Sequence, residues 1–237
     1  MSTPKPGNKL PELRKRIIQI AASYVGQRSI VEGGNQRGFH DPIFEKKMRG
    51  IGWFKTASGN SLAWCNTFCR LVYKEALLGG NSVITNVPKP GTWVEKGVGS
   101  YLGIPVTFPD GRTKLTKWAR KSYGALDPTV TNTRKNFTNM VRYVDITKNG
   151  APQPSLLKEY WNNNIILPGD CFINAAGAKA NSSSGQHIGI FIAPTSDFKS
   201  IITIEGNYSK KCLIQTRPIN GKKAVGGFTQ LLVSPNY

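Results

Sequence analysis

The chain has 237 residues, of which 32 are Lys or Arg and 13 are Asp or Glu, so its formal net charge at pH 7 is +19. Apolar residues make up 39% and aromatic residues 10% of the sequence, which is enough to bury a core and excludes wholesale disorder. The longest apolar stretches, such as 188–193, fall far short of the roughly 18 consecutive apolar residues that a membrane span needs.

The positive charge is spread along the whole chain rather than gathered in one tail. Such a field favours binding to an extended polyanion, and DNA, RNA, anionic lipid and anionic cell-wall polymers all qualify. The sequence contains no zinc-finger or RNA-recognition pattern, so nucleic acid is a secondary expectation as partner. Residues 1–9 are polar and lack the apolar core of a secretion signal, so we expect no signal peptide.

Cysteine and histidine usage argues against a metal site and against a disulfide framework. The four cysteines form no C-x-x-C pair, and two histidines are too few to complete a metal site with them: Cys65, Cys69, Cys171, Cys212, His40 and His187. We therefore expect no metal and no cofactor. Cys171 and Cys212 lie in apolar, strand-like runs and are interpreted as buried core thiols.

The first third of the chain predicts three helices. Residues 11–26 have apolar residues at helical spacing, and Gly26 follows as a stop. After a loop predicted over 27–40, Asp41-Pro42 is typical of an N-cap and first turn for a helix that ends near residue 50. A stronger helix is predicted over 63–78 and ends at two glycines.

The remainder changes from a region broken by Pro and Gly to the period of a sheet. The middle region favours a strand over 104–108, a basic segment over 114–122, and a short helix over 155–161 with Ser155 as its cap. Five later segments predict strands: 170–175, 187–193, 200–205, 212–218 and 227–233. Because helices come first and strands last without βαβ alternation, the predicted fold class is α+β with an antiparallel sheet.

One set of residues has the composition of a nucleophilic cysteine site, which needs a thiolate, a base and a group that orients the base. Cys65 lies in the first turn of a predicted helix, where free backbone N–H groups and the helix dipole lower a thiol pKa. His187 opens a predicted strand, and Glu205 and Asn207 lie at the end of the next one. Either residue could orient the imidazole; a carboxylate holds an imidazolium more strongly, so we favour Glu205, with Asn207 assisting.

Four short segments around these residues resemble one enzyme family. The segments are Trp64-Cys65-Asn66-Thr67-Phe68, Pro168-Gly169-Asp170, Gln186-His187-Ile188-Gly189-Ile190 and Glu205-Gly206-Asn207. They resemble, in order, the W-C-x-x-F, P-G-D, G-H-V-G-I and E-G-N segments of CHAP amidohydrolases and peptidases, relatives of the NlpC/P60 cell-wall enzymes. Gln186 stands where that family has Gly.

The resemblance implies a papain-like fold in which N-terminal helices pack on a C-terminal antiparallel sheet. It covers about 10–80 and 165–235, so we expect a single domain over 1–237 with an insertion at about 100–160. The basic and aromatic residues of that insertion would suit contact with a glycan or an anionic polymer, and a solvated decoration is an equal reading. Outside the resemblance, Cys69 and His40 are interpreted as structural.

The implied activity is that of a peptidoglycan hydrolase. Cys65 would attack an amide carbonyl and His187 would act as base and acid, either as an endopeptidase or as an N-acetylmuramoyl-L-alanine amidase. Trp64 and Gln186, the neighbours of these two residues, are candidate substrate contacts. A hydrolase of this kind without a signal peptide suggests a phage lysis protein, a virion-associated protein or a secreted effector. The alternative is a non-catalytic basic virion module, or a module that binds nucleic acid or glycan, on the same scaffold.

Overall fold

The protein is described by a computed structural model that covers 12–53, 63–78, 125–126, 130–140, 142–174, 187–221 and 224–231. Within these ranges it combines five helices with antiparallel sheets, which confirms the predicted α+β class. None of the helices in these ranges is both long and apolar enough to cross a bilayer.

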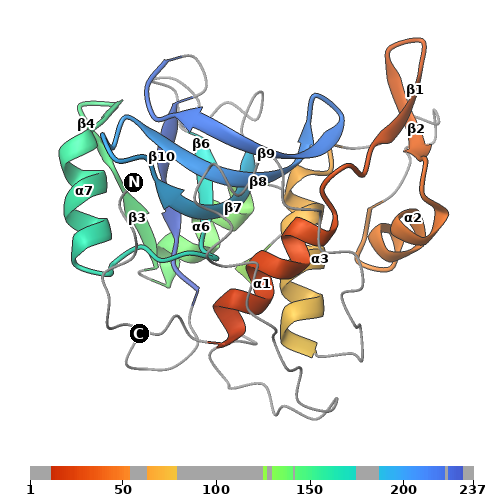
Figure 1. Ribbon diagram of the computed structural model, residues 1–237, viewed down its shortest axis with the longest axis horizontal. Helices are drawn as coiled ribbons and strands as arrows, with labels where there is room; N and C mark the ends of the chain where they lie inside the picture. The colour runs from red at the N-terminus through yellow and green to blue at the C-terminus, as the bar shows by residue number, and fades with distance from the viewer. Residues whose placement is uncertain are drawn as a thin grey trace.

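A six-stranded antiparallel sheet in the order β3-β10-β6-β7-β8-β9 forms the centre of the fold (Figure 1). Its strands are rich in Ile, Val and Phe, whose branched and aromatic side chains suit a pleated surface. They span Tyr143–Asp145 (β3), Cys171–Asn174 (β6), Ile188–Pro194 (β7), Ser200–Tyr208 (β8), Lys211–Pro218 (β9) and Val225–Thr229 (β10). The five strands predicted after residue 165 are therefore present, with shifted ends.

The inner strands β6, β7 and β10 are buried on both faces of the sheet. Successive side chains of a strand point to opposite faces, so β6 and β7 each contribute to two apolar clusters. Along β6, Cys171 and Ile173 belong to one apolar cluster and Phe172 to another. Helices α1 (Glu12–Ser23) and α3 (Cys65–Leu78) pack in the first cluster, and helix α7 (Pro154–Asn162) packs in the second, on the other side of the sheet in Figure 1. The nucleophile candidate thus starts a helix that lies directly on the central strands.

The prediction of a loop over 27–40 is wrong, because these residues form a β-hairpin. Strands β1 (Ser29–Glu32) and β2 (Asn35–Phe39) are joined by Gly33-Gly34, whose φ values of 54° and 82° allow a two-residue turn. The tip of the hairpin (31–35) is exposed, so these strands lack the apolar alternation by which strands are recognised. A backbone hydrogen bond attaches its base to the turn between β8 and β9: Ser29 N–H donates to the Lys210 carbonyl at 3.0 Å.

The predicted start of helix α2 is correct, whereas the predicted start of helix α7 is not. Helix α2 (Pro42–Arg49) begins as predicted, since the Asp41 carboxylate accepts from the N–H groups of Ile43 and Phe44. Helix α7 begins at Pro154 with Gln153 in the capping position, so the prediction of Ser155 as cap is wrong. Proline fixes φ near its helical value and needs no capping partner for a missing N–H, which explains the earlier start.

Much of the expected insertion over 100–160 belongs to the body of the fold. Helix α6 (Val130–Asn139) buries Phe137 and receives a hydrogen bond from the side chain of Asn66, next to Cys65, to Thr133 at 3.1 Å. Strand β3 extends the central sheet, and the hairpin of β4 (Thr147–Lys148) and β5 (Ala151–Pro152) follows it. A solvated decoration therefore does not describe α6 or β3, whereas residues 148–151 of the β4–β5 hairpin are exposed. The strand at 104–108 and the basic segment at 114–122 lie outside the described residues.

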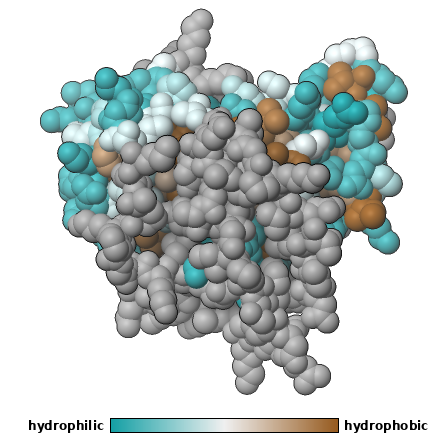
Figure 2. Space-filling model, in the orientation of Figure 1, coloured by the Kyte–Doolittle hydropathy of each residue, from teal (hydrophilic) through white to brown (hydrophobic). Residues whose placement is uncertain are grey.

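Figure 2 shows mostly hydrophilic side chains over the lobe formed by the β1–β2 hairpin and α2, with small apolar spots. Among the described residues, the exposed large apolar side chains are Val31 and Ile43. Both belong to this lobe, which stands beside the central sheet in Figure 1.

Close packing of α3 against β8 depends on one glycine beside the candidate site. A Cβ added to Gly206 would lie 2.5 Å from both Cβ and Cγ of Phe68. Such a contact is shorter than van der Waals packing allows, and the Phe68 atoms involved lie too near their own backbone to move freely. Gly206 therefore sets how near the helix and the strand approach each other.

We expect Gly206→Ala to lower the free energy of unfolding by about 1–3 kcal/mol through overpacking. The measurement is thermal or denaturant unfolding followed by circular dichroism. Gly50→Ala is the matched control, because Gly50 is exposed with φ of −64° and its added Cβ would meet atoms no nearer than 3.4 Å. Equal stability of the two variants would contradict this account of the helix–strand contact.

Candidate active site

Cys65 is the first residue of α3, and its side chain is almost fully buried at 4% exposure. The backbone N–H groups of Asn66 and Ile188 and the side chain of His187 all hydrogen-bond to its sulfur. The first N–H groups of a helix have no partner within the helix and carry partial positive charge, so they favour an anion there. The start of α3 is thus a place where a thiolate is stabilised.

His187 lies immediately before β7, between the nucleophile candidate and an acidic residue. Its Nε2 is 2.7 Å from Oε2 of Glu205, and its ring is also hydrogen-bonded to Cys65. Because Nε2 is engaged by Glu205, the bond to the thiol must use Nδ1. The His187 side chain keeps 16% exposure, so the imidazole remains accessible to solvent at one edge.

The charges of this pair support a thiolate and an imidazolium. Burial opposes ionisation of Cys65, but the hydrogen bond and charge of His187 and the two backbone N–H groups outweigh it and lower the thiol pKa. Burial likewise opposes the charged imidazole, yet the bonds to Cys65 and Glu205 raise the pKa of His187 to about 9. The His187 ring is therefore protonated at neutral pH, and its charge favours the thiolate form of Cys65.

Glu205 has no exposure to water, and its carboxylate is fully hydrogen-bonded. Its Oε1 accepts from the hydroxyl of Thr203 at 2.6 Å and from Nε of Arg217 at 2.9 Å. Its Oε2 accepts from His187 and from Nη2 of Arg217. Burial alone would raise the carboxyl pKa, but these donors and the two positive charges hold the pKa of Glu205 at about 2. Of the two residues considered as orienter, Glu205 is the one bonded to His187.

Among the residues that the structure describes, no hydrogen bond joins Asn207 to the imidazole of His187. Asn207 has a positive φ of 62°, and its side-chain oxygen accepts from Nε2 of Gln36 on β2 at 2.9 Å. This hydrogen-bond partner belongs to the β1–β2 hairpin, and the expectation that Asn207 assists Glu205 in holding His187 is not met by this geometry. Asn tolerates the left-handed conformation better than most residues, which fits its place at this bend.

The two candidate substrate contacts have different outcomes. Trp64 is completely buried, with its ring centroid 5.1 Å from that of Phe39 and 5.9 Å from that of Phe44. The expectation that its side chain touches substrate is wrong for this conformation, and its aromatic contacts instead support the start of α3. Gln186 lies outside the described residues.

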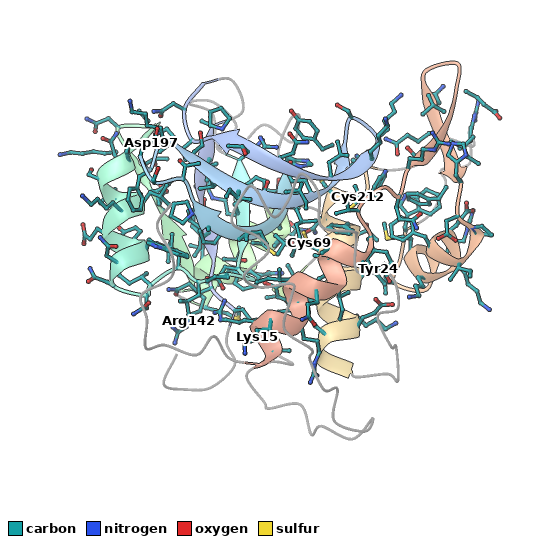
Figure 3. All side chains as sticks on the ribbon, viewed as in Figure 1. Lys15, Tyr24, Cys69, Arg142, Asp197 and Cys212 are labelled. Carbon is teal, nitrogen blue, oxygen red and sulfur yellow. The ribbon has the colours of Figure 1, made fainter. Side chains whose placement is uncertain are left out.

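The other sequence candidates occupy structural positions. Cys69 and Cys212 lie where α3 meets the sheet (Figure 3), and burial raises the pKa of both thiols. Cys171 is also buried and within 3.6 Å of the Tyr73 hydroxyl, and the four cysteines are free of disulfides. His40 is exposed. In the described part of the chain, no group of three or more His, Cys, Asp and Glu side chains is arranged to hold a metal ion.

Sequence reasoning missed Arg217 and Thr203, which complete the surroundings of Glu205. The register of β8 and β9 explains why these residues meet. Ile201, Thr203 and Glu205 are alternate residues of β8, so their side chains lie on one face of the sheet. Arg217 is paired with Ile201 and therefore lies on the same face. Gly189 leaves the space that this face needs, because a Cβ there would lie 2.7 Å from the Phe172 ring and 2.9 Å from Cγ of Glu205. Arg217 could have been found from the sequence only if the register between β8 and β9 had been known.

Comparison with known proteins adds no relative to this description. No protein-family model, no curated protein and no solved structure matches the chain. The site is therefore interpreted from its own geometry.

We expect Cys65 to be alkylated by iodoacetamide before the other three cysteines at neutral pH, because its surroundings lower its thiol pKa, whereas burial raises the pKa of Cys69 and Cys212. Replacing His187 by Gln removes the positive charge that lowers the thiol pKa, so the pH midpoint of Cys65 alkylation should rise. Mass spectrometry of the four cysteine peptides over a pH series provides the measurement. Preferential labelling of Cys69 or Cys171 in the folded protein would contradict the assignment.

A second prediction separates Glu205 from Asn207. Glu205→Gln removes a negative charge from His187, so the pKa of the imidazole should fall from about 9 towards 6.5, whereas Asn207→Ala should leave it near the wild-type value. The two ring signals of the chain can be followed by NMR, and His40→Gln assigns them. An equal fall in both variants would show that Asn207 shares the orienting role.

Proposed function

We propose that the protein is a cysteine hydrolase of amide bonds with a papain-like arrangement, and that its substrate is bacterial peptidoglycan. The observation that carries the proposal is the hydrogen-bonded series from Cys65 through His187 to Glu205, in which three elements distant in sequence meet. A nucleophile, its base and an orienting carboxylate in that order are the parts that nucleophilic cysteine catalysis needs.

The reaction follows from these positions. The Cys65 thiolate attacks the carbonyl carbon of the amide, forming a carbon–sulfur bond and a tetrahedral oxyanion. His187 gives its proton to the leaving nitrogen as the carbon–nitrogen bond breaks, which leaves a thioester. The imidazole then takes a proton from water, which attacks the thioester and releases the acid and the thiolate. The backbone N–H of Cys65, at the start of α3, is a natural donor to the oxyanion.

The peptidoglycan substrate is proposed from the resemblance to CHAP enzymes, and local structure gives three of its motifs a physical role. Gly189 and Gly206 each stand where a side chain would collide, beside Glu205 and Phe68 respectively. Gly169 has φ of 91°, and Asp170 after it is buried in an ion pair with Arg14. These constraints support the likeness of the segments as more than shared composition, with cleavage of a stem-peptide, cross-bridge or muramoyl–alanine amide bond as the implied reaction.

The net charge of +19 is consistent with a polyanionic target. Long-range attraction concentrates a cationic enzyme near an anionic envelope and its polymers. We propose action on the cell wall as a phage lysis protein, a virion-associated protein or a secreted effector.

The alternative is a non-catalytic module that grips nucleic acid or glycan through its positive surface. The surroundings of His187 weigh against it, because burying Glu205, Arg217 and His187 together requires each charge to be matched by a partner. A binding surface gains nothing from charges held inside the protein, whereas a thiolate site depends on them.

The decisive experiment is digestion of purified peptidoglycans of several chemotypes, with mass spectrometry of the released fragments. We expect wild-type protein to release fragments with one new amine and one new carboxyl end, Cys65→Ala to release none, and Cys69→Ala to retain most activity. Both variants remove one buried sulfur from α3, so Cys69→Ala is the matched control for folding.

No fragment from any chemotype, combined with tight DNA binding that weakens steeply with salt, would contradict the hydrolase and favour the binding module. Loss of activity in Cys69→Ala and not in Cys65→Ala would overturn the nucleophile assignment.

A further inference from the structure

Arg217 is a buried basic residue, with 4% exposure within the central sheet. Its guanidinium meets the Glu205 carboxylate as a fork, with Nε donating to Oε1 and Nη2 donating to Oε2. Two parallel bonds fix the plane of a carboxylate as well as its position. Oε2, the oxygen that accepts from His187, is thereby held in one direction.

The guanidinium is itself held by residues of two other strands, β6 and β8. From its place on β9, Arg217 donates through Nη1 to Asn174 on β6 at 3.3 Å. Its guanidinium carbon lies 4.9 Å from the ring centre of Phe172 and 5.6 Å from that of Tyr208. Planar stacking and a fixed set of donors are properties of Arg that Lys lacks. The contact with Glu205 is therefore a built one and not a flexible surface pair.

The charges around Glu205 balance only when Arg217 is included. The titratable or charged groups that face Glu205 are His187 before β7, Arg217 and Cys212 on β9, and Cys69 on α3; Thr203 adds an uncharged donor from β8. Burial raises the pKa of Cys69 and Cys212, so both thiols are neutral. With a Cys65 thiolate and a His187 imidazolium, the site holds two negative and two positive charges.

We propose that Arg217 is a positioning residue that fixes the Glu205 carboxylate on His187 and so favours the thiolate form of Cys65. The inference rests on the proposed function only in taking Cys65 as the nucleophile. Arg217 acts through Glu205 and His187 and does not itself touch the sulfur in any hydrogen bond of the described residues.

The direction of the effect follows from electrostatics. Removing a buried positive charge favours proton binding by every nearby acidic group, so the thiol pKa rises. Releasing the carboxylate from its fork also weakens its bond to the imidazolium, which is the charge that stabilises the thiolate. Both consequences move formation of the Cys65 thiolate to higher pH.

The test measures the rate of Cys65 alkylation by iodoacetamide against pH, read from the Cys65 peptide by mass spectrometry. In Arg217→Met, which removes charge and fork, we expect the midpoint to rise by about one pH unit or more. In Arg217→Lys, which keeps a charge without the fork, we expect a smaller rise. Thermal unfolding of each variant establishes that it is folded.

Arg14→Met is the matched control for a purely structural effect. Arg14 is also a buried arginine. It forms an ion pair with Asp170 at 2.9 Å and takes no part in the His187–Glu205 contact. Losing this pair should lower thermal stability while leaving the alkylation midpoint at the wild-type value. A structural role for Arg217 would affect stability alone, whereas a positioning role changes the pH profile.

An unchanged midpoint in folded Arg217→Met overturns the proposal, and so does an equal shift in Arg14→Met. If Arg217→Met does not unfold cooperatively, Arg217→Lys decides by the same criterion: a raised midpoint supports positioning and an unchanged one overturns it. Failure of the wild-type protein to release peptidoglycan fragments would refute the proposed function, but the alkylation profile would still report on Arg217.

Discussion

Much of the site depends on a carboxylate that has no contact with water. A buried ionised carboxylate is stable only when its lone pairs are matched by donors and its charge by cations. Glu205 meets this requirement with Thr203, Arg217 and His187, which come from β8, β9 and the start of β7. Satisfying one side chain therefore ties together three strands and places the imidazole beside the first turn of α3.

The second requirement is close approach between backbone segments. The nucleophile helix must lie near the strand that carries Glu205, and the strand after His187 must leave room for the Glu205 side chain. Gly206 meets the first need against Phe68, and Gly189 meets the second against Glu205 and Phe172. Both glycines act through the absence of a side chain and not through backbone freedom, since neither has a positive φ.

The four cysteines differ in the surroundings of their thiols and not in exposure, and the surroundings set the thiol pKa. All four sulfurs are buried, so access alone does not distinguish them. Cys65 lies at the helix start beside His187 and two backbone N–H donors, and these lower its pKa despite burial. Cys69, one turn later on the same helix, has burial as the largest influence, and its pKa rises. A distance of one helical turn thus separates a nucleophile candidate from a core residue.

The sequence by itself determined the α+β class, the main helices and the late run of strands, because their apolar periodicity and stop residues are local properties. It also determined Cys65, His187 and Glu205 as candidates, since their positions relative to predicted helix and strand ends could be deduced along the chain. Only the tertiary structure decided that Glu205 and not Asn207 is hydrogen-bonded to the imidazole, that Trp64 is buried, and that Arg217 is bonded to Glu205. It likewise revealed the β1–β2 hairpin and the edge strand β3. The hairpin is local in sequence, but its strands lack the apolar alternation that would reveal them. The other features depend on strand register and on contacts between segments far apart in sequence, which leave no periodic pattern along the chain.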